Sequence, residues 1–171
     1  MSIKWIGAFL IVTGCGGFGF SLAAAHRRET ALLRGLQRAL QYMQNELKYR
    51  LTPLPELCAQ AGIEAGGQLK VVFTDLSRAM ERQLSPDAAS CMTDAIRKSK
   101  ESLPVSMRRL LGQLGRSLGR FDLEGQLRGL GALEKACGEV LDNLEENKDL
   151  RLRNYQTLGL CAGAALAILF A

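Results

Sequence analysis

The side chains that most often perform catalysis or bind metals are few in this sequence and lie far apart. His26 is the only histidine, and it stands beside an apolar run, so serine nucleophiles lack a histidine base. Zinc sites need cysteine and histidine ligands at short spacings, which are absent. The sequence therefore predicts no enzyme, no cofactor and no metal site. The five cysteines form no close pair, and we interpret them as buried, reduced thiols of a reducing compartment: Cys15, Cys58, Cys91, Cys137 and Cys161.

The carboxylates of the acidic stretch near the C-terminus are also interpreted without catalysis. Glu145, Glu146 and Asp149 stand near Lys148 and Arg151, at spacings that form solvated ion pairs on one helix. There is no phosphate-binding loop, no dinucleotide-binding glycine motif and no zinc-protease motif. The sequence predicts no small-molecule substrate.

The net charge of +5 is concentrated where the charged part of the chain meets two apolar runs. Anionic lipid head groups explain such a distribution. No basic stripe with interleaved aromatic residues is present, so the sequence predicts no nucleic-acid partner.

The two apolar runs determine the predicted domain organisation. No charged side chain occurs from Trp5 to Ala25 or from Asn154 to Ala171. A membrane-spanning helix needs roughly 20 apolar residues, and both runs are close to that length. We predict a transmembrane helix over 3–25, a helical bundle over 26–153 and a second transmembrane helix over 154–171. Basic residues on the inner sides of both runs predict that the bundle faces the cytoplasm.

Two alternatives to a retained first span stay open at this point. Lys4, the apolar stretch and the alanines at 23–25 resemble a secretory signal with its cleavage site. The segment that ends at Cys15 also resembles the box before a lipid-modified cysteine. Either would make the protein an exported envelope protein, anchored by lipid or by its tail.

Small residues recur every four positions in both predicted spans. In lipid, such faces let two helices approach closely, so we predict helix packing there. The candidate residues are Thr13, Gly17, Ser21 and Ala25 in the first span and Gly159, Gly163, Ala167 and Ala171 in the second.

The segment between the spans predicts an all-α bundle of about six helices. Apolar residues recur at intervals of three and four over Thr30–Leu51, Leu69–Leu84 and much of 104–153. Thr52 and Ser85 are predicted N-caps, each followed by proline, and Asp122 is predicted to cap the last helix. Gly62 is predicted to end a short helix, and the last helix is expected to run unbroken into the second span. For the glycines between 112 and 131, we expect either close helix approach or a kink near Gly119.

Three segments resemble one known family, stage III sporulation protein AB. They are Leu33–Glu46 with Tyr49–Leu54, then Leu114–Gly119 with Asp122 and Gln126, and finally Tyr155–Gly159 with Gly163. That family is similar to the inner-membrane platform protein of type II secretion and type IV pilus machines.

The resemblance implies a non-enzymatic platform protein in the mother-cell membrane of a sporulating bacterium. Such a protein is part of the channel complex between mother cell and forespore, and its partners are other subunits, including a cytoplasmic ATPase. We expect the polar faces of the first and last cytoplasmic helices to dock partners, with Arg34, Arg38, Glu145 and Glu146 as candidate residues.

Overall fold

The described part of the chain is a bundle of antiparallel helices. The computed structural model describes residues 27–50, 52–83, 87–119 and 122–170, with side chains as far as Glu146. A helix over 27–49 is followed by α2 (Leu54–Ala65), α3 (Gly67–Glu81), α4 (Ala88–Lys98), α5 (Val105–Ser117) and α6 (Leu123–Phe170). Within these residues no strand occurs, which confirms the prediction of an all-α domain with about six helices.

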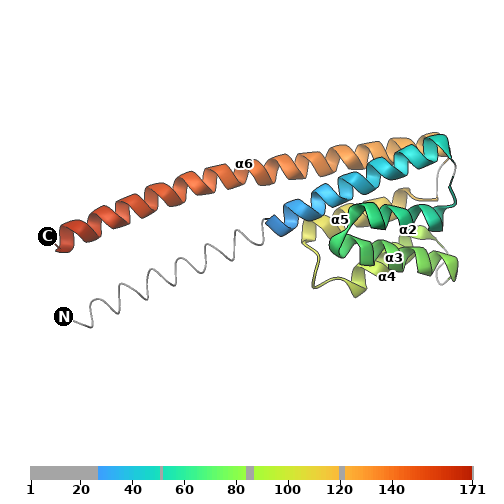
Figure 1. Cartoon of the computed structure of the whole chain (residues 1–171), viewed down its shortest axis with the longest axis horizontal. Coiled ribbons are helices and arrows are strands. Elements are labelled where there is room, and N and C mark those ends of the chain that lie inside the picture. The colour runs from blue at the N-terminus through green and yellow to red at the C-terminus, as the bar shows by residue number, and fades with distance from the viewer. Residues whose placement is uncertain (1–26, 51, 84–86, 120–121, 171) are drawn as a thin grey trace.

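Successive helices alternate in direction, so their ends gather at two opposite ends of the bundle (Figure 1). Helix 27–49 lies along the first half of α6. Helices α2 to α5 pack on the side of helix 27–49 that faces away from α6. The second half of α6 extends beyond the bundle. The helix is continuous from Leu123 to Phe170, which confirms that the last helix runs on without a break.

The second predicted span lies on this projecting part of α6, and the first lies outside the described residues. Within the described residues, no helix combines the length and the apolar character that a membrane crossing needs.

The core confirms the apolar spacings read from the sequence. The stripe of helix 27–49 is buried at Leu33, Leu36, Leu40 and Met43. Buried side chains of the other helices meet it, with Phe73 the largest. Fully burying a leucine or phenylalanine contributes about 1.5–3 kcal/mol, so these stripes supply the main driving force for assembly. The remaining core residues include Leu57, Leu69, Val72, Leu76, Met92, Met107, Leu111, Leu114, Leu130 and Leu133.

One of the three predicted caps is confirmed and two are wrong. The carboxylate of Asp122 accepts a hydrogen bond from the Gly125 N–H at 3.0 Å, as an N-cap does. At α4 the capping residue is Asp87 instead of Ser85, and its carboxylate accepts from the Ser90 N–H at 2.9 Å. At α2 the N-cap is Pro53. Thr52 lies one position before that N-cap, and its hydroxyl donates to the Glu46 carboxylate at 2.8 Å.

The prediction that Gly62 ends a helix is also wrong. Helix α2 continues through Gly62 to Ala65. A Cβ atom added at Gly62 would lie 2.7 Å from the Cβ of Phe73, so this glycine lets α2 and α3 pack closely. The chain reverses at Gly66 and Gly67 instead, whose φ angles of 70° and 51° favour glycine.

The glycines of α5 and α6 have different roles. A Cβ at Gly115 would lie 2.6 Å from the Cβ of Met92, so the expected close approach occurs between α5 and α4. Gly119 lies beyond the end of α5 with a φ of 72°, so it forms a turn and not a kink within a helix. Gly131 has open space around it.

Candidate functional site

Two of the four candidate docking residues, Arg34 and Glu145, meet where helix 27–49 lies against α6. Arg34 and Glu145, 111 positions apart in the sequence, form an ion pair at 3.1 Å between Nη2 and Oε1. Their side chains remain 59% and 53% exposed, so the pair is open to a partner. Exposed pairs of this kind contribute at most about 1 kcal/mol to stability. A partner that separated this pair would therefore cost the fold little stability.

A second set of cross-helix bonds continues this contact line. Gln41 and Gln44 donate from their side-chain amides to the two carboxylate oxygens of Glu134, at 2.7 and 2.8 Å. We call this line of cross-helix contacts the polar seam; it consists of Arg34, Gln41, Gln44, Glu134 and Glu145. The sequence analysis missed the two glutamines and this carboxylate. Their partners lie about 90 residues away along the chain, and only the spacing of the glutamines on one helix face gave any signal.

Arg38 has a structural role that the sequence did not predict. Its guanidinium donates to the backbone carbonyls of Glu64 at 3.2 Å and Ala65 at 3.3 Å. These carbonyls end α2, where the helix dipole favours a cation. Arg38 therefore ties helix 27–49 to the α2–α3 turn. Glu146, the fourth candidate, is exposed beside Glu145.

We expect Glu134→Ala to lower the free energy of unfolding by about 1–2 kcal/mol. The substitution removes the acceptor of two hydrogen bonds to a charged group and leaves two amides unpaired at the seam. Urea unfolding of the detergent-solubilised chain, followed by circular dichroism, measures the change. Glu139→Ala, at an exposed position five residues further along α6, is the control. Equal effects of the two substitutions would contradict the role of Glu134.

The described cysteines are buried and unreactive. Burial raises the pKa of the Cys58 thiol to about 12. Burial, with a smaller contribution from Glu134, raises the pKa of Cys137 to about 11, and its Sγ donates to the Leu33 carbonyl at 3.4 Å. Cys91 is also buried. These positions confirm the interpretation as buried thiols for three of the five cysteines, since the side chains of Cys15 and Cys161 lie outside the description.

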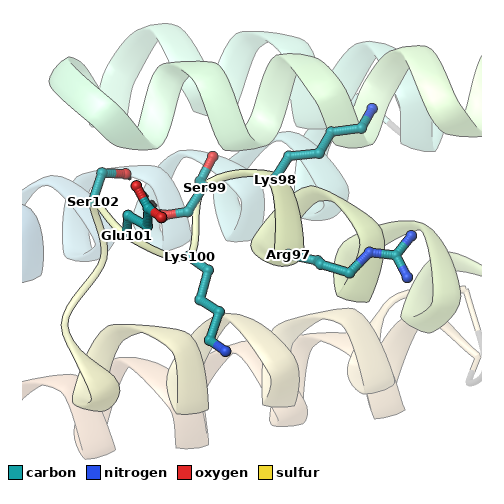
Figure 2. Close-up of a pocket in the computed structure, with 6 residues that line it drawn as sticks. All are labelled: Arg97, Lys98, Ser99, Lys100, Glu101 and Ser102. Carbon is teal, nitrogen blue, oxygen red and sulfur yellow. Dashed lines mark hydrogen bonds between the residues drawn. The ribbon is translucent and has the colours of Figure 1, made fainter.

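The connection between α4 and α5 borders a shallow depression of about 400 Å³. Its lining residues are Arg97, Lys98, Ser99, Lys100, Glu101 and Ser102. Figure 2 shows that Arg97, Lys98 and Lys100 point in different directions. The cations therefore do not converge on one small ligand. Across the described residues, no group of three histidine, cysteine or acidic side chains is arranged to hold a metal ion.

The candidate residues for packing within the membrane stay predictions. Thr13, Gly17 and Ser21 lie outside the described residues. Gly159, Gly163 and Ala167 lie on the projecting part of α6, beyond the described side chains.

Comparison with known proteins relates both the sequence and the fold to one family. The family model described as stage III sporulation protein AB matches residues 4–171. A relative of that name from Bacillus subtilis (strain 168) is 25% identical over 173 aligned residues, which cover 98% of each chain. A solved structure titled stage III sporulation protein AB superposes with a TM-score of 0.64 at 22% identity. It covers 72% of this chain and 98% of its own, and it shows that the fold is shared.

Proposed function

Because this chain belongs to the stage III sporulation protein AB family, we propose that it is a non-enzymatic platform of the sporulation channel complex and docks a secretion-type ATPase. Family membership makes it a sporulation protein and a component of the SpoIIIA complex. The docking role and the ATPase partner are the proposal. The observation that carries it is the polar seam, a partly exposed line of charged and amide side chains that bond across two helices.

The seam suits docking for a physical reason. Docking orders fewer side chains when the surface is preorganised, which reduces the entropic cost of binding. The two glutamines hold the Glu134 carboxylate from both sides, and Arg34 and Glu145 pair across the same two helices. Arrangements of this kind steer a partner and fix its register.

Two membrane spans, over 3–25 and 154–171, complete the proposal. The support is the absence of charged side chains from Trp5 to Ala25 and from Asn154 to Ala171. Basic residues beside both runs, on the side of the bundle, favour a cytoplasmic bundle in the mother cell, where an ATPase has access to the seam.

We expect Arg34→Glu to weaken binding of the purified ATPase subunit at least tenfold. The substitution places two carboxylates side by side in the seam, and it reverses a charge that we propose the partner contacts. The exchange of both charges, Arg34→Glu with Glu145→Arg, restores an ion pair within the bundle but not the surface pattern. We therefore expect the exchange to recover the free energy of unfolding, measured by urea unfolding, but not the affinity for the ATPase. Interferometry on the detergent-solubilised chain measures that affinity.

Arg78→Glu, an exposed charge reversal on α3, is the matched control and should leave binding unchanged. Arg38 is unsuitable for this test because its hydrogen bonds to α2 couple its charge to stability. Unchanged ATPase affinity in both Arg34→Glu and the exchanged pair would refute docking through the seam.

A further inference from the structure

Three segments that are far apart in the sequence meet at one end of the bundle (Figure 1). They are the start of helix 27–49, the α2–α3 turn and the α4–α5 connection. Gln68 joins them: with its amide oriented to satisfy both partners, it donates to the Ser102 carbonyl at 2.7 Å and accepts from the Arg28 guanidinium. The Ser106 hydroxyl of α5 also donates to the Glu29 carboxylate.

This end of the bundle is rich in exposed cations. We call it the basic end; its cations are Arg27, Arg28, Arg97, Lys98 and Lys100, all exposed. Four carboxylates lie at this end: Asp94 pairs with Arg97 at 2.8 Å and Glu29 accepts from Ser106, while Glu64 and Glu101 are exposed. Within the described part of the chain, Lys98 and Lys100 form no ion pair. Their charges are therefore available to an anionic surface.

The basic end is also where the chain leaves the bundle toward both apolar runs. Helix 27–49 begins there, directly after residues 3–25, and α6 passes it on the way to residues 154–171. If both runs span the membrane, as proposed above, this end faces the bilayer. The α4–α5 connection lies at this end, on the side of helix 27–49 away from α6 (Figure 1), 74 residues after the first run and 50 before the second in sequence.

We propose that the α4–α5 connection binds anionic phospholipid head groups and forms a third contact between the bundle and the bilayer. The inference rests on the proposed two-span anchoring. Arg97, Lys98 and Lys100 diverge in Figure 2, which suits an array of separate phosphates better than a single enclosed ligand. The open, shallow form of the depression agrees with contact against a surface. Juxtamembrane basic residues are attracted to anionic leaflets within a Debye length of about 10 Å.

The test uses the full chain reconstituted into vesicles of phosphatidylcholine, with or without phosphatidylglycerol. A fluorophore is attached to a cysteine introduced by Ser99→Cys, and lipids with a nitroxide on the head group quench it. A second variant, Tyr49→Cys, carries the label at the opposite end, where the native tyrosine is 74% exposed. Cys15 and Cys161 are replaced by alanine in both.

We expect the Ser99→Cys label to be quenched at least threefold more than the Tyr49→Cys label in vesicles with phosphatidylglycerol. Lys98→Glu with Lys100→Glu, or about 0.5 M salt, should remove most of the difference because both weaken the attraction between cations and head groups. Equal quenching at both ends, or no dependence on phosphatidylglycerol, would overturn the proposal. The proposal would also be overturned if the Lys98→Glu/Lys100→Glu chain kept the quenching of its Ser99→Cys label and lost affinity for the ATPase. The α4–α5 connection would then bind a protein partner.

Alkaline carbonate extraction of the same vesicles separates the two hypotheses. A chain that carbonate removes from the vesicles refutes two-span anchoring, and the head-group contact that depends on it. A chain that resists extraction with an unquenched Ser99→Cys label refutes the head-group contact alone.

Discussion

Gly35→Ala is expected to lower the free energy of unfolding by about 3 kcal/mol, although alanine is the better helix former. A Cβ at this position would lie 2.6 Å from the backbone oxygen of Ala65 and 3.5 Å from its carbonyl carbon. Real Cβ contacts are not that short, so a helix must move. Overpacking in a close-packed interior costs about 1–3 kcal/mol when flexible side chains absorb it, and a backbone atom yields less readily.

The neighbouring contacts prevent an inexpensive shift. The Ala65 oxygen accepts a hydrogen bond from Arg38, one turn after Gly35, and the Gly66 N–H donates to the Gly62 oxygen at 3.1 Å. Moving α2 away to make room for the methyl group would stretch the bond from Arg38, which lies on helix 27–49, while the Gly66–Gly62 bond holds the end of α2 in its helical form. It would also disturb the close contact of Gly62 with Phe73. The cost at Gly35 should therefore exceed the gain in helix propensity of about 1 kcal/mol.

Gly131→Ala provides a control of the same chemical change in open space. No heavy atom lies within 4 Å of a Cβ built at Gly131, so only the propensity gain remains. We expect stabilisation by up to about 1 kcal/mol. Urea unfolding of the detergent-solubilised chain, followed by circular dichroism, measures both. Similar changes in the two variants would contradict the close approach of helix 27–49 to the end of α2.

The family and the helices could be predicted because both depend on patterns within short segments. The resemblance in three segments is confirmed by the match over residues 4–171. The apolar spacing of helix 27–49 is confirmed by the burial of Leu33, Leu36 and Leu40. Periodicity reports which face is buried, whichever neighbour covers it.

The predictions failed where a residue's role depends on a contact with another part of the chain and not on its own helix or cap propensity. Glycine is a helix breaker by propensity, but at Gly62 the gain from packing against Phe73 outweighs that preference. Thr52 is a good N-cap in isolation, but α2 begins one residue later, after Pro53, and the Thr52 hydroxyl instead donates to Glu46 of the preceding helix. Arg38 resembles a solvated surface cation until the fold brings the end of α2 beside it. None of these partners can be identified from spacing along the chain.

The native Cys58 is expected to react with a maleimide about a thousandfold more slowly than a cysteine introduced at Gln60. The thiolate is the reactive form, and burial raises the pKa of Cys58 from 9.0 to about 12. A rise of three pKa units lowers the thiolate fraction near pH 7 about a thousandfold. Gln60 is exposed on the same helix, so Gln60→Cys carries an ordinary thiol. Maleimide labelling that is quenched at successive times and followed by mass spectrometry gives both rates. Similar rates would contradict the burial of Cys58.

The same pKa fixes the direction of the pH dependence of stability. Below pH 9 the thiol is neutral in the folded and the unfolded chain, so it adds no pH dependence. Between pH 9 and about 12 the unfolded thiol ionises first, so stability should fall as pH rises. Cys137, whose pKa is about 11, contributes in the same direction. Cys58→Ala should flatten the decline above pH 9, measured by urea unfolding; an unchanged slope would contradict this assignment.

Slow labelling of the native thiols also determines how the membrane topology must be measured. A membrane-impermeant maleimide that fails to label Cys58, Cys91 or Cys137 in intact cells reports their burial, whichever side the bundle faces. Gln60→Cys removes this ambiguity because its thiol is exposed. If the bundle is cytoplasmic, as proposed, that cysteine should be labelled only after the membrane is permeabilised. Labelling in intact cells would place the bundle outside, where a cytoplasmic ATPase has no access to the polar seam.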